Sequence, residues 1–426
     1  MRLQHIATED ITGGAARCAY RLHQALRDAG VDSRMLVRRK ASDDPTVQAF
    51  RPSPTVSARL RRRLRRWRIR RALQDNEDRR SVRYEPFHGD LTESGPELLD
   101  WVDDEAHVVH LHWVSRFLDY PSVLPELARR GPVVWTLHDM NMFTGGCHYD
   151  DGCGRYTLEC GRCPQLDSNE ESDPSRGVWR RKRTLFSRLS KGRLHFVTPS
   201  QWLARELRAS GIVPEDTPIS VIPYGVDTAT FRPIPVAQAR DSLGLPPDKK
   251  AVLFVAESVE SRRKGFGELR ATLPLLDRTD DFLLLSLGKG QPSFDLDIEH
   301  HHLGFVKDDE RLATVYSAAD VFAMPSQEDN LPATVLESLA CGTPVVAFDT
   351  GGLPDMVRPG VTGALAPLGD RAAFARRLRA QLDASPTLRN GCRTVAEQEY
   401  SLDRQAERYM ALYESVLDTP SPAAPV

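Results

Sequence analysis

Short apolar runs alternate with amphipathic stretches in the first half of the chain. The apolar run Leu3–Ala7 predicts a strand, and after Gly13-Gly14 apolar residues recur at helical spacing up to Gly30, a residue typical of helix ends. Successive strand, helix and strand predict a parallel sheet. The same pattern predicts further strands at Val31–Val37, His107–Trp113, Pro132–Leu137 and Leu194–Pro199, and helices at Ser122–Arg130 and about Gln201–Ser210.

A second alternation begins after Ile222–Asp227 and the proline-rich Arg232–Val236. Two alternations separated by this hinge predict two doubly wound domains whose facing strand ends form a ligand cleft. The strands of the second are predicted at Ala251–Ala256, Phe282–Leu287, Leu303–Val306, Val321–Met324 and Pro344–Phe348. We expect domains at 1–230 and 231–399, a C-terminal helix at 400–417 that crosses back to the first domain, and a disordered tail at 418–426.

Composition narrows the class of protein. The chain is 40% hydrophobic and 27% charged, with a formal net charge of −2, which suits a soluble globular protein and favours no polyanionic partner such as nucleic acid. No run approaches the ~18 apolar residues that span a membrane. The start, Met1–His5, lacks the apolar core of a signal peptide. We therefore expect a cytoplasmic protein, whose seven cysteines do not indicate a secreted disulfide scaffold.

The segment from 319 to 347 carries the clearest functional pattern. An apolar strand ends at Pro325, a polar and acidic loop follows, and a helix begins near Pro332. A helix N-terminus at the carboxyl edge of a sheet is a natural diphosphate site. Glu337 lies farther along that helix, where a carboxylate can accept from both hydroxyls of a ribose. An exposed helical glutamate without function is the alternative, because most glutamates are exposed.

These residues resemble a known family. Pro325-Ser326, Asp329 and the run from Glu337 to Ala347 resemble the signature of family 4 of the retaining glycosyltransferases, which have the two-domain GT-B fold. In that family two acidic residues are separated by seven, as Asp329 and Glu337 are, although the first is usually a glutamate. The resemblance implies that Glu337 binds the donor ribose and that Asp329, a shorter carboxylate, acts at the donor sugar. Asn330 and Leu331, in the same loop, are also expected to contact the donor.

Other segments extend the resemblance over nearly the whole chain. Gly13-Gly14 match the glycine turn near the donor, and Trp135–Asp139 resembles the segment that brings a histidine, here His138, to the donor sugar. Leu303–Val306 resembles the strand that holds the base, so Phe305 and Val306 are expected donor contacts. Tyr224–Asp227 resembles the interdomain signature, with tyrosine in place of asparagine.

The basic residues that contact the diphosphate depart from the family pattern. The family has an arginine five residues before the lysine of a Lys-Gly pair, but Val259 stands five residues before Lys264 here. We infer that Lys264 keeps its role and that Arg262 or Arg263 replaces the missing arginine, with Arg263 favoured. Positive charge fixed in advance stabilises a leaving diphosphate. The alternative is a solvated basic turn.

The resemblance implies an enzyme, a retaining hexosyltransferase that moves a sugar from a nucleoside-diphosphate sugar to a glycan or lipid-linked acceptor in polysaccharide or glycoconjugate biosynthesis. In the front-face transfer that it implies, no cofactor is required for catalysis. Two alternatives stay open: another sugar enzyme with this fold, such as a nucleotide-sugar epimerase, and a zinc-knuckle protein that binds nucleic acid.

Four cysteines cluster in the loop 145–165, directly after His138. The loop holds Cys147, Cys153, Cys160 and Cys163, and the last two form a Cys-x-x-Cys pair. Four thiolates in a reducing compartment suit a tetrahedral structural zinc. Four unrelated thiols and an iron–sulfur cluster are the alternatives.

The segment 56–73 predicts a basic helix. Nine arginines lie between Arg59 and Arg71, interleaved with Leu60, Leu64 and Trp67 at helical spacing. A basic helix with an apolar strip suits an anionic membrane surface, which predicts peripheral attachment at the inner face of the membrane. The alternatives are a helix that packs its leucines on the domain, with its arginines in water, and an arginine-rich contact with nucleic acid.

Overall fold

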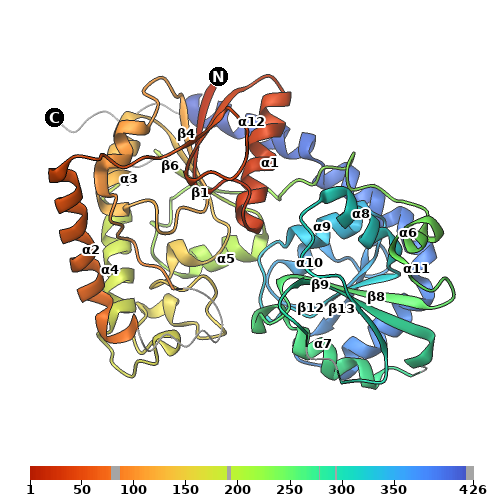
Figure 1. The fold of residues 1–426 in the computed structure, drawn as a ribbon. Coiled ribbons are helices and arrows are strands. Elements are labelled where there is room, and N and C mark those ends of the chain that lie inside the picture. The colour runs from red at the N-terminus through yellow and green to blue at the C-terminus, as the bar shows by residue number, and fades with distance from the viewer. Residues whose placement is uncertain (78–86, 190–192, 278, 293–294, 419–426) are drawn as a thin grey trace. The chain divides into compact units, whose positions relative to one another are not determined.

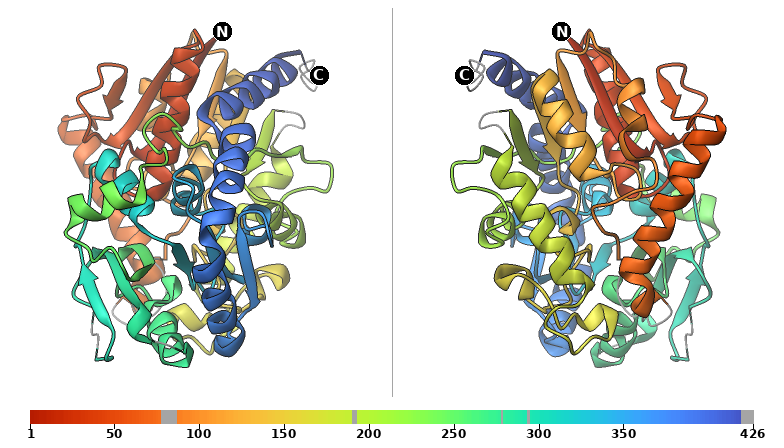
Figure 2. Two further views of the ribbon diagram at one scale, coloured as in Figure 1. Left: turned by 90° about the vertical axis from the view of Figure 1, so that its right-hand side faces the viewer. Right: turned by 90° about the vertical axis from the view of Figure 1, so that its left-hand side faces the viewer.

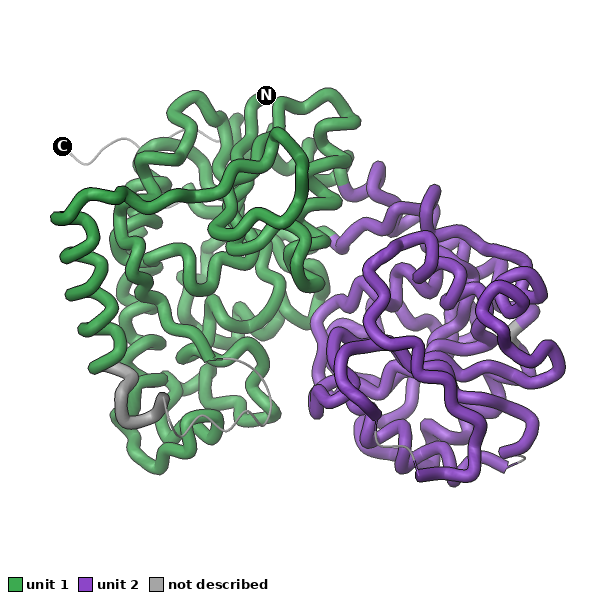
Figure 3. Tube along the Cα trace, viewed as in Figure 1, with its two compact units in different colours: residues 1–222, 406–426 green, residues 223–405 purple. Residues whose placement is uncertain are grey.

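The computed structural model describes residues 1–77, 87–189, 193–277, 279–292 and 295–418. The chain forms two compact units, Met1–Ile222 with Ala406–Val426, and Pro223–Gln405 (Figure 3). The sequence predicted a boundary between the two domains at 230 and a C-terminal helix that crosses back to the first domain from residue 400; the structure has these boundaries after Ile222 and after Gln405. Each unit has its own sheet and its own core, and each is described below by itself.

Unit 1 contains a seven-stranded parallel sheet in the order β3-β2-β1-β4-β5-β6-β7 (Figure 1). The strands are β1 (Arg2–Glu9), β2 (Asp32–Arg39), β3 (Val47–Ala49), β4 (Val108–Leu111), β5 (Val133–Thr136), β6 (Leu194–Thr198) and β7 (Ile219–Val221). The helices are α1 (Gly14–Asp28), α2 (Val56–Glu77), α3 (Tyr120–Arg130), α4 (Pro174–Arg188) and α5 (Gln201–Ala209). Strands β4 and β5 are buried along their whole length, as expected for parallel strands covered on both faces.

Unit 2 contains a six-stranded parallel sheet in the order β10-β9-β8-β11-β12-β13. The strands are β8 (Lys250–Ser258), β9 (Phe282–Lys289), β10 (Glu299–His302), β11 (Val321–Met324), β12 (Val345–Asp349) and β13 (Gly363–Pro367). The helices are α6 (Val236–Leu243), α7 (Phe266–Thr272), α8 (Asp309–Ala318), α9 (Ala333–Ala340), α10 (Leu353–Met356) and α11 (Arg371–Tyr400). Most predicted strands match within a few residues.

One predicted strand is wrong. Leu303–Val306 is a loop, and the edge strand β10 lies just before it, at Glu299–His302. Strand β10 has no apolar run that would predict it. Its side chains His300 and His302 instead hydrogen-bond the Ser286 hydroxyl of β9. Gly304 has a φ of +66°, which takes the chain out of the extended conformation before Phe305.

The order of connections in each sheet defines a switch point where a ligand site is expected. In unit 1 the chain leaves β1 on one side and returns to β4 on the other. In unit 2 the same reversal occurs between β8 and β11. Loops after neighbouring strands diverge there, and a crevice opens at their carboxyl ends.

The last helix, α12 (Leu402–Asp418), packs two tyrosines into unit 1. Tyr409 and Tyr413 are fully buried, and their hydroxyls lie 2.7 Å from Thr136 Oγ1 and from His110 Nδ1. Burying a tyrosine body while pairing its hydroxyl stabilises such a contact. Tyr409 and Tyr413 of α12 are therefore part of the first unit's core.

Helix α2 is held to unit 1 by arginines, not by leucines, and Figure 2 shows it on the outside of that unit. Arg62 Nη1 lies 2.7 Å from Glu97 Oε2, and Arg65 Nη2 lies 2.5 Å from Asp119 Oδ2, whose side chain is fully buried. These arginines share one face of the helix with the buried Ala58.

The opposite face of α2 carries the apolar strip. Leu60, Leu64 and Trp67 are 58%, 53% and 54% exposed. At about 100° per residue, positions 60, 64 and 67 lie across the helix from 58, 62 and 65. The alternative in which the leucines pack on the domain with the arginines in water is therefore wrong, because Glu97 and the buried Asp119 bind the arginines instead.

Candidate active site

Three charged side chains meet at the switch point of unit 2. The short 3₁₀ turn Arg262–Lys264 follows β8, and Asp329 lies in the loop after β11, the neighbouring parallel strand. Lys264 Nζ lies 2.6 Å from Asp329 Oδ2, and Arg263 Nη1 lies 3.3 Å from the same oxygen. Because the carboxyl ends of parallel neighbours lie at one sheet edge, these separate segments form one cluster.

Two glycines allow the backbone to close around this cluster. Gly265 has a φ of +77°, and a β-carbon there would lie 2.0 Å from the Pro325 carbonyl oxygen. Gly351 has a φ of +58°, and a β-carbon there would lie 1.9 Å from the carbonyl oxygen of Asp329. Both positions therefore need glycine, for conformation and for space. The Gly352 N–H also donates to the Asp329 carbonyl at 2.9 Å.

The cluster carries more positive than negative charge. Burial raises the pKa of Asp329, but the charges of Lys264 and Arg263 outweigh burial and leave it below its usual value. Asp329 is thus an anion at neutral pH, held between two cations. Two cationic side chains therefore lie around one carboxylate, a set of groups that suits an anionic ligand.

Glu337 is buried in α9. It is the fifth residue of the helix and only 5% exposed, so the alternative of an exposed helical glutamate is wrong. The hydroxyl of the fully buried Tyr316 on α8 donates to Glu337 Oε2 at 3.2 Å. Sequence reasoning did not find this partner, because the contact joins two helices. Asn330 and Leu331, between Asp329 and α9, are also buried.

The other predicted donor residues of unit 2 differ in exposure. Arg263 is buried and its Nη1 donates to the Glu328 carbonyl at 2.9 Å, whereas Arg262 is exposed. Phe305 is 45% exposed, with Lys289 Nζ 4.8 Å from its ring centroid, and Val306 is half-buried. Of the two arginines, Arg263 is thus the one that the structure brings to Lys264 and Asp329.

Gly13 and Gly14 lie at the switch point of unit 1. Gly13 has a φ of +93° and caps α1, which begins at Gly14. A side chain at Gly13 would be strained by its backbone conformation alone. There is space for one, because a β-carbon at either glycine would meet nothing within 4 Å. The turn leaves the first N–H groups of a 15-residue helix at the carboxyl edge of the sheet.

His138 follows β5 and ends a chain of buried histidines. His112 Nδ1 lies 3.3 Å from His138 Nε2, and His5 Nδ1 lies 2.9 Å from His112 Nε2. Burial lowers the pKa of His138 to about 4, so its ring is neutral at pH 7. Sequence analysis missed His5 as a member of this chain. His5 joins the other histidines because it pairs with His110 in the adjacent parallel strand, and this pairing is seen only in the folded sheet.

The same histidines include a group with metal-ligand spacing. Among the described residues, His5, His110 and His112 offer three ligand atoms within 4.8 Å of one another. Both ring nitrogens of His110 already bond hydroxyls, of Tyr413 and of Thr136. The group is therefore a hydrogen-bonded core network.

Asp139, next to His138, is fixed by three donors. The Trp113 Nε1–H donates to its Oδ2 at 2.7 Å, and the Asn141 N–H donates to Oδ1 at 2.9 Å. His148 Nδ1 lies 2.6 Å from Oδ2. His148 directly follows Cys147, so the cysteine-containing loop and the predicted catalytic histidine are linked through Asp139.

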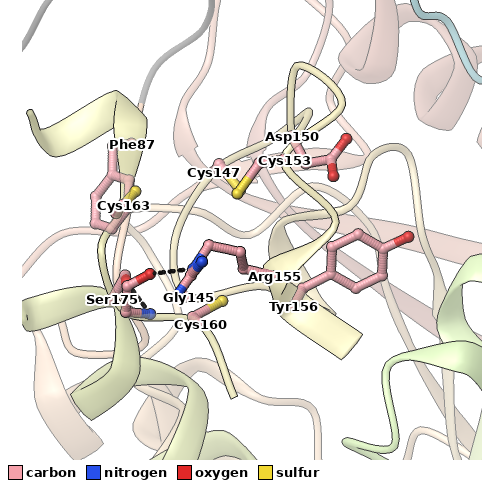
Figure 4. Close-up of a pocket in the computed structure, with 11 residues that line it drawn as sticks. Phe87, Gly145, Cys147, Asp150, Cys153, Arg155, Tyr156, Cys160, Cys163 and Ser175 are labelled. Atoms are coloured by element: carbon pink, nitrogen blue, oxygen red, sulfur yellow. Dashed lines mark hydrogen bonds between the residues drawn. The ribbon is translucent and has the colours of Figure 1, made fainter. Parts of the chain in front are cut away.

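The four cysteines of the loop 145–165 line one pocket of unit 1 (Figure 4). All four are free thiols. Burial raises the pKa of Cys160 to about 12 and that of Cys163 to about 11. The structure thus brings all the predicted cysteines together.

Comparison with known proteins identifies the family of both units. A family model for glycosyltransferase family 4 matches residues 12–230, and one for group 1 glycosyl transferases matches residues 249–384. A D-inositol 3-phosphate glycosyltransferase of Actinosynnema mirum is 35% identical over 221 residues, which are 47% of this chain and 52% of that protein. The chain spans about half the length of the curated relatives of this kind.

A longer match is the putative colanic acid biosynthesis glycosyl transferase WcaC of Escherichia coli K12. It is 26% identical over 355 residues, 79% of this chain and 80% of that protein. Among solved structures, Anabaena HepE in complex with UDP-glucose superposes with a TM-score of 0.64 at 16% identity, covering 97% of this chain and 100% of HepE.

This likeness and the two parallel sheets confirm the predicted GT-B fold. The matches support neither the epimerase nor the nucleic-acid-binding alternative. Because the first family model spans more than half of its residues, the chain belongs to glycosyltransferase family 4.

Proposed function

We propose that this chain is a retaining glycosyltransferase that moves a hexose from a nucleoside-diphosphate sugar to a glycan or lipid-linked acceptor. The observation that carries the proposal is the cluster of Lys264, Arg263 and Asp329, with its excess positive charge at a switch point. A leaving diphosphate gains negative charge as the glycosidic bond breaks, and cations fixed beforehand stabilise it without reorganisation. No cofactor is needed for this role.

Each remaining residue takes a role that suits its surroundings. Glu337 accepts hydrogen bonds from the donor ribose, with Tyr316 holding one carboxylate oxygen. His138 is neutral at pH 7 and so hydrogen-bonds a sugar hydroxyl without adding charge. Asp329 holds Lys264 in position, and its proposed role is at the junction of the donor sugar and the diphosphate.

Substitutions of Lys264 and Glu337 test these roles. We expect Lys264→Ala to lower kcat by about 10²–10³, as loss of a preorganised charge partner does. We expect Glu337→Gln to raise the KM for the donor about tenfold, because hydrogen bonds to a charged acceptor contribute about 1.5–3 kcal/mol. UDP-glucose, the ligand of HepE, is the first donor to assay, by donor hydrolysis and by transfer.

Matched controls lie on the surface of the same unit. Lys249 pairs with Glu299 and Glu397 pairs with Arg393, in partly exposed ion pairs that do not involve the residues of the cluster. Lys249→Ala and Glu397→Gln should leave kcat and KM unchanged. Full activity in both Lys264→Ala and Glu337→Gln would overturn the assignment of this site.

The proposed acceptor is bound at an anionic membrane surface, on the inner face of the membrane. None of the helices in the described part of the chain has the length and apolarity to cross a bilayer. The support comes from the outer face of α2, where Leu60, Leu64 and Trp67 are exposed among arginines. Such a face inserts its apolar side chains at the headgroup boundary, while each arginine near an anionic surface contributes about 1 kcal/mol.

Liposome flotation tests membrane attachment. The wild-type chain should float with vesicles of phosphatidylglycerol and phosphatidylcholine, but not with phosphatidylcholine alone. Changing Leu60, Leu64 and Trp67 to serine should abolish flotation. Leu275 and Leu368, exposed leucines of unit 2, provide the control variant, which should still float. Equal flotation of both variants would refute attachment through α2, and binding to DNA in place of vesicles would favour the nucleic-acid alternative.

A further inference from the structure

The pocket lined by the four cysteines has no part in the proposed transfer reaction. Cys147, Cys153, Cys160 and Cys163 lie on one loop, and Figure 4 shows them around the same pocket with Tyr156. Between Asn141 and Leu166 the regular structure consists of short 3₁₀ turns, at Asn141–Phe143, Arg155–Leu158 and Pro164–Leu166. The order of this segment therefore depends on turns and side-chain contacts.

A buried lysine adds positive charge beside the pocket. Lys182 on α4 is fully buried, and its Nζ donates to the carbonyl oxygens of Asn141 and Thr144, just before Cys147. Within the described ranges no carboxylate forms an ion pair with Lys182. A buried ammonium without an anionic partner is costly. Four thiolates on a divalent cation have a net charge of −2, which Lys182 would partly balance.

The backbone of the loop is strained. Four residues of the loop other than glycine have positive φ, and so does Asp167 just after it: Asp151, Glu159, Cys160 and Arg162 are the four. Such conformations cost on the order of 1–3 kcal/mol each and persist where the surroundings fix them. Tyr149, Tyr156 and Cys160 of the loop belong to the large core of unit 1, whereas Cys163 lies in a smaller apolar cluster with Phe87 and Leu166.

We propose that Cys147, Cys153, Cys160 and Cys163 bind one structural zinc ion as thiolates. Sulfur is a preferred zinc ligand, and four cysteines complete a closed tetrahedral site with no position for substrate. Zinc would draw each sulfur to about 2.3 Å from the ion. The sulfurs are more widely spaced in the structure, since the described groups of three ligand atoms within 4.8 Å do not include them. Closing the site therefore requires the loop to tighten.

The ion would act on the candidate active site by position alone. Cys147 is followed by His148, whose ring holds Asp139 at 2.6 Å, and Asp139 follows His138. Zinc bound at Cys147 would fix the backbone next to His148, and so the position of the ring that holds Asp139. The inference does not depend on the proposed transfer reaction, because metal content is measured without a substrate.

Elemental analysis of the purified full chain is the direct test. We expect about one zinc per chain after dialysis, and no acid-labile sulfide. The variant Cys160→Ser/Cys163→Ser should lose the zinc, whereas Cys392→Ser, which changes a fully buried cysteine of unit 2, should keep it. Absence of metal, iron with sulfide in place of zinc, or zinc retained in the double variant would each overturn the proposal.

A second measurement uses only the wild-type chain, in case the double variant does not fold. Cobalt exchanged into the protein should give the intense thiolate-to-cobalt absorption and the visible bands of a tetrahedral four-sulfur site. Chelation should also lower the Tm reported by tryptophan fluorescence, since all six tryptophans lie in unit 1. A cobalt spectrum without thiolate bands would refute the four-cysteine ligand set.

Discussion

Acidification should unfold unit 1 at a pH where most proteins are still stable. Burial lowers the pKa of His23, His138 and His195 to about 4, and that of His5 and His110 well below the ordinary value of 6.5. The unfolded chain therefore binds more protons than the folded chain between pH 6.5 and 4. The stability from these neutral rings is fully present above pH 6.5 and is lost as the pH falls through this window.

The size of the effect follows from the pKa difference. One unit of pKa corresponds to about 1.4 kcal/mol, so at pH 5 each histidine with a folded pKa of about 4 costs about 2 kcal/mol. His23, His138 and His195 together cost about 6 kcal/mol. Domains are stable by about 5–15 kcal/mol, so this loss alone approaches the whole stability of unit 1. His195 is the least buried of the three, and solvent screening reduces its share.

Tryptophan fluorescence measures the effect in unit 1 alone, because all six tryptophans lie there. Urea unfolding followed by fluorescence between pH 7.5 and 4.5 should show a free energy of unfolding that falls steeply below pH 6.5. His23→Gln should reduce the slope by about 1.4 kcal/mol per pH unit, since one proton fewer is taken up on unfolding. The matched control is His107→Gln, at an exposed histidine of the same unit.

An unchanged slope in His23→Gln would refute the reasoning, because His23 would then not titrate on unfolding. A free energy of unfolding that stays flat from pH 7.5 to 5 would refute it more broadly. The pKa values of Asp10 and Asp139 are lowered from 3.8, so the contribution of these carboxylates falls mainly below about pH 5. The slope between pH 6.5 and 5 is therefore the part that reports the histidines.

Two further predictions concern unit 2. Gly351→Ala should destabilise the unit by several kcal/mol in thermal unfolding, because its β-carbon would lie 1.9 Å from the Asp329 carbonyl oxygen. Gly369→Ala, at a similar positive φ but with nothing within 4 Å, should cost only about 1 kcal/mol; equal losses would contradict the steric argument. Tyr316→Phe should raise the KM for the donor severalfold with little change in kcat, since it removes the hydroxyl that holds Glu337. A lower kcat with unchanged KM would contradict a role in binding alone.

Local patterns were enough to predict most of the fold. Apolar runs such as Val321–Met324 coincide with strand β11, because strands buried on both faces are continuous in apolar residues. Edge strand β10 was missed for the opposite reason. Its histidines are half-buried and pair with a serine of the neighbouring strand, a contact absent from any local pattern.

The packing of helix α2 also depends on contacts that a local sequence pattern does not show. Its sequence predicts the helix and the apolar strip, but which face turns inward depends on acids far along the chain. Glu97 and Asp119 lie under the helix and bind Arg62 and Arg65. Because a buried carboxylate without a partner is costly, these acids select the arginine face over the leucine face.

The sequence by itself determined the residue types of the candidate site and their order along the chain. Gly13, Lys264 and Glu337 are marked by local motifs, since turns, helix starts and basic pairs are set by neighbouring residues. Only the tertiary structure decided which of these side chains meet. The turn that holds Arg263 lies beside Asp329 because β8 and β11 are adjacent in the sheet, and in that turn Arg263 is buried whereas Arg262 is exposed. Burial and charge pairing arise between strands distant in sequence, and they set the charge of the site.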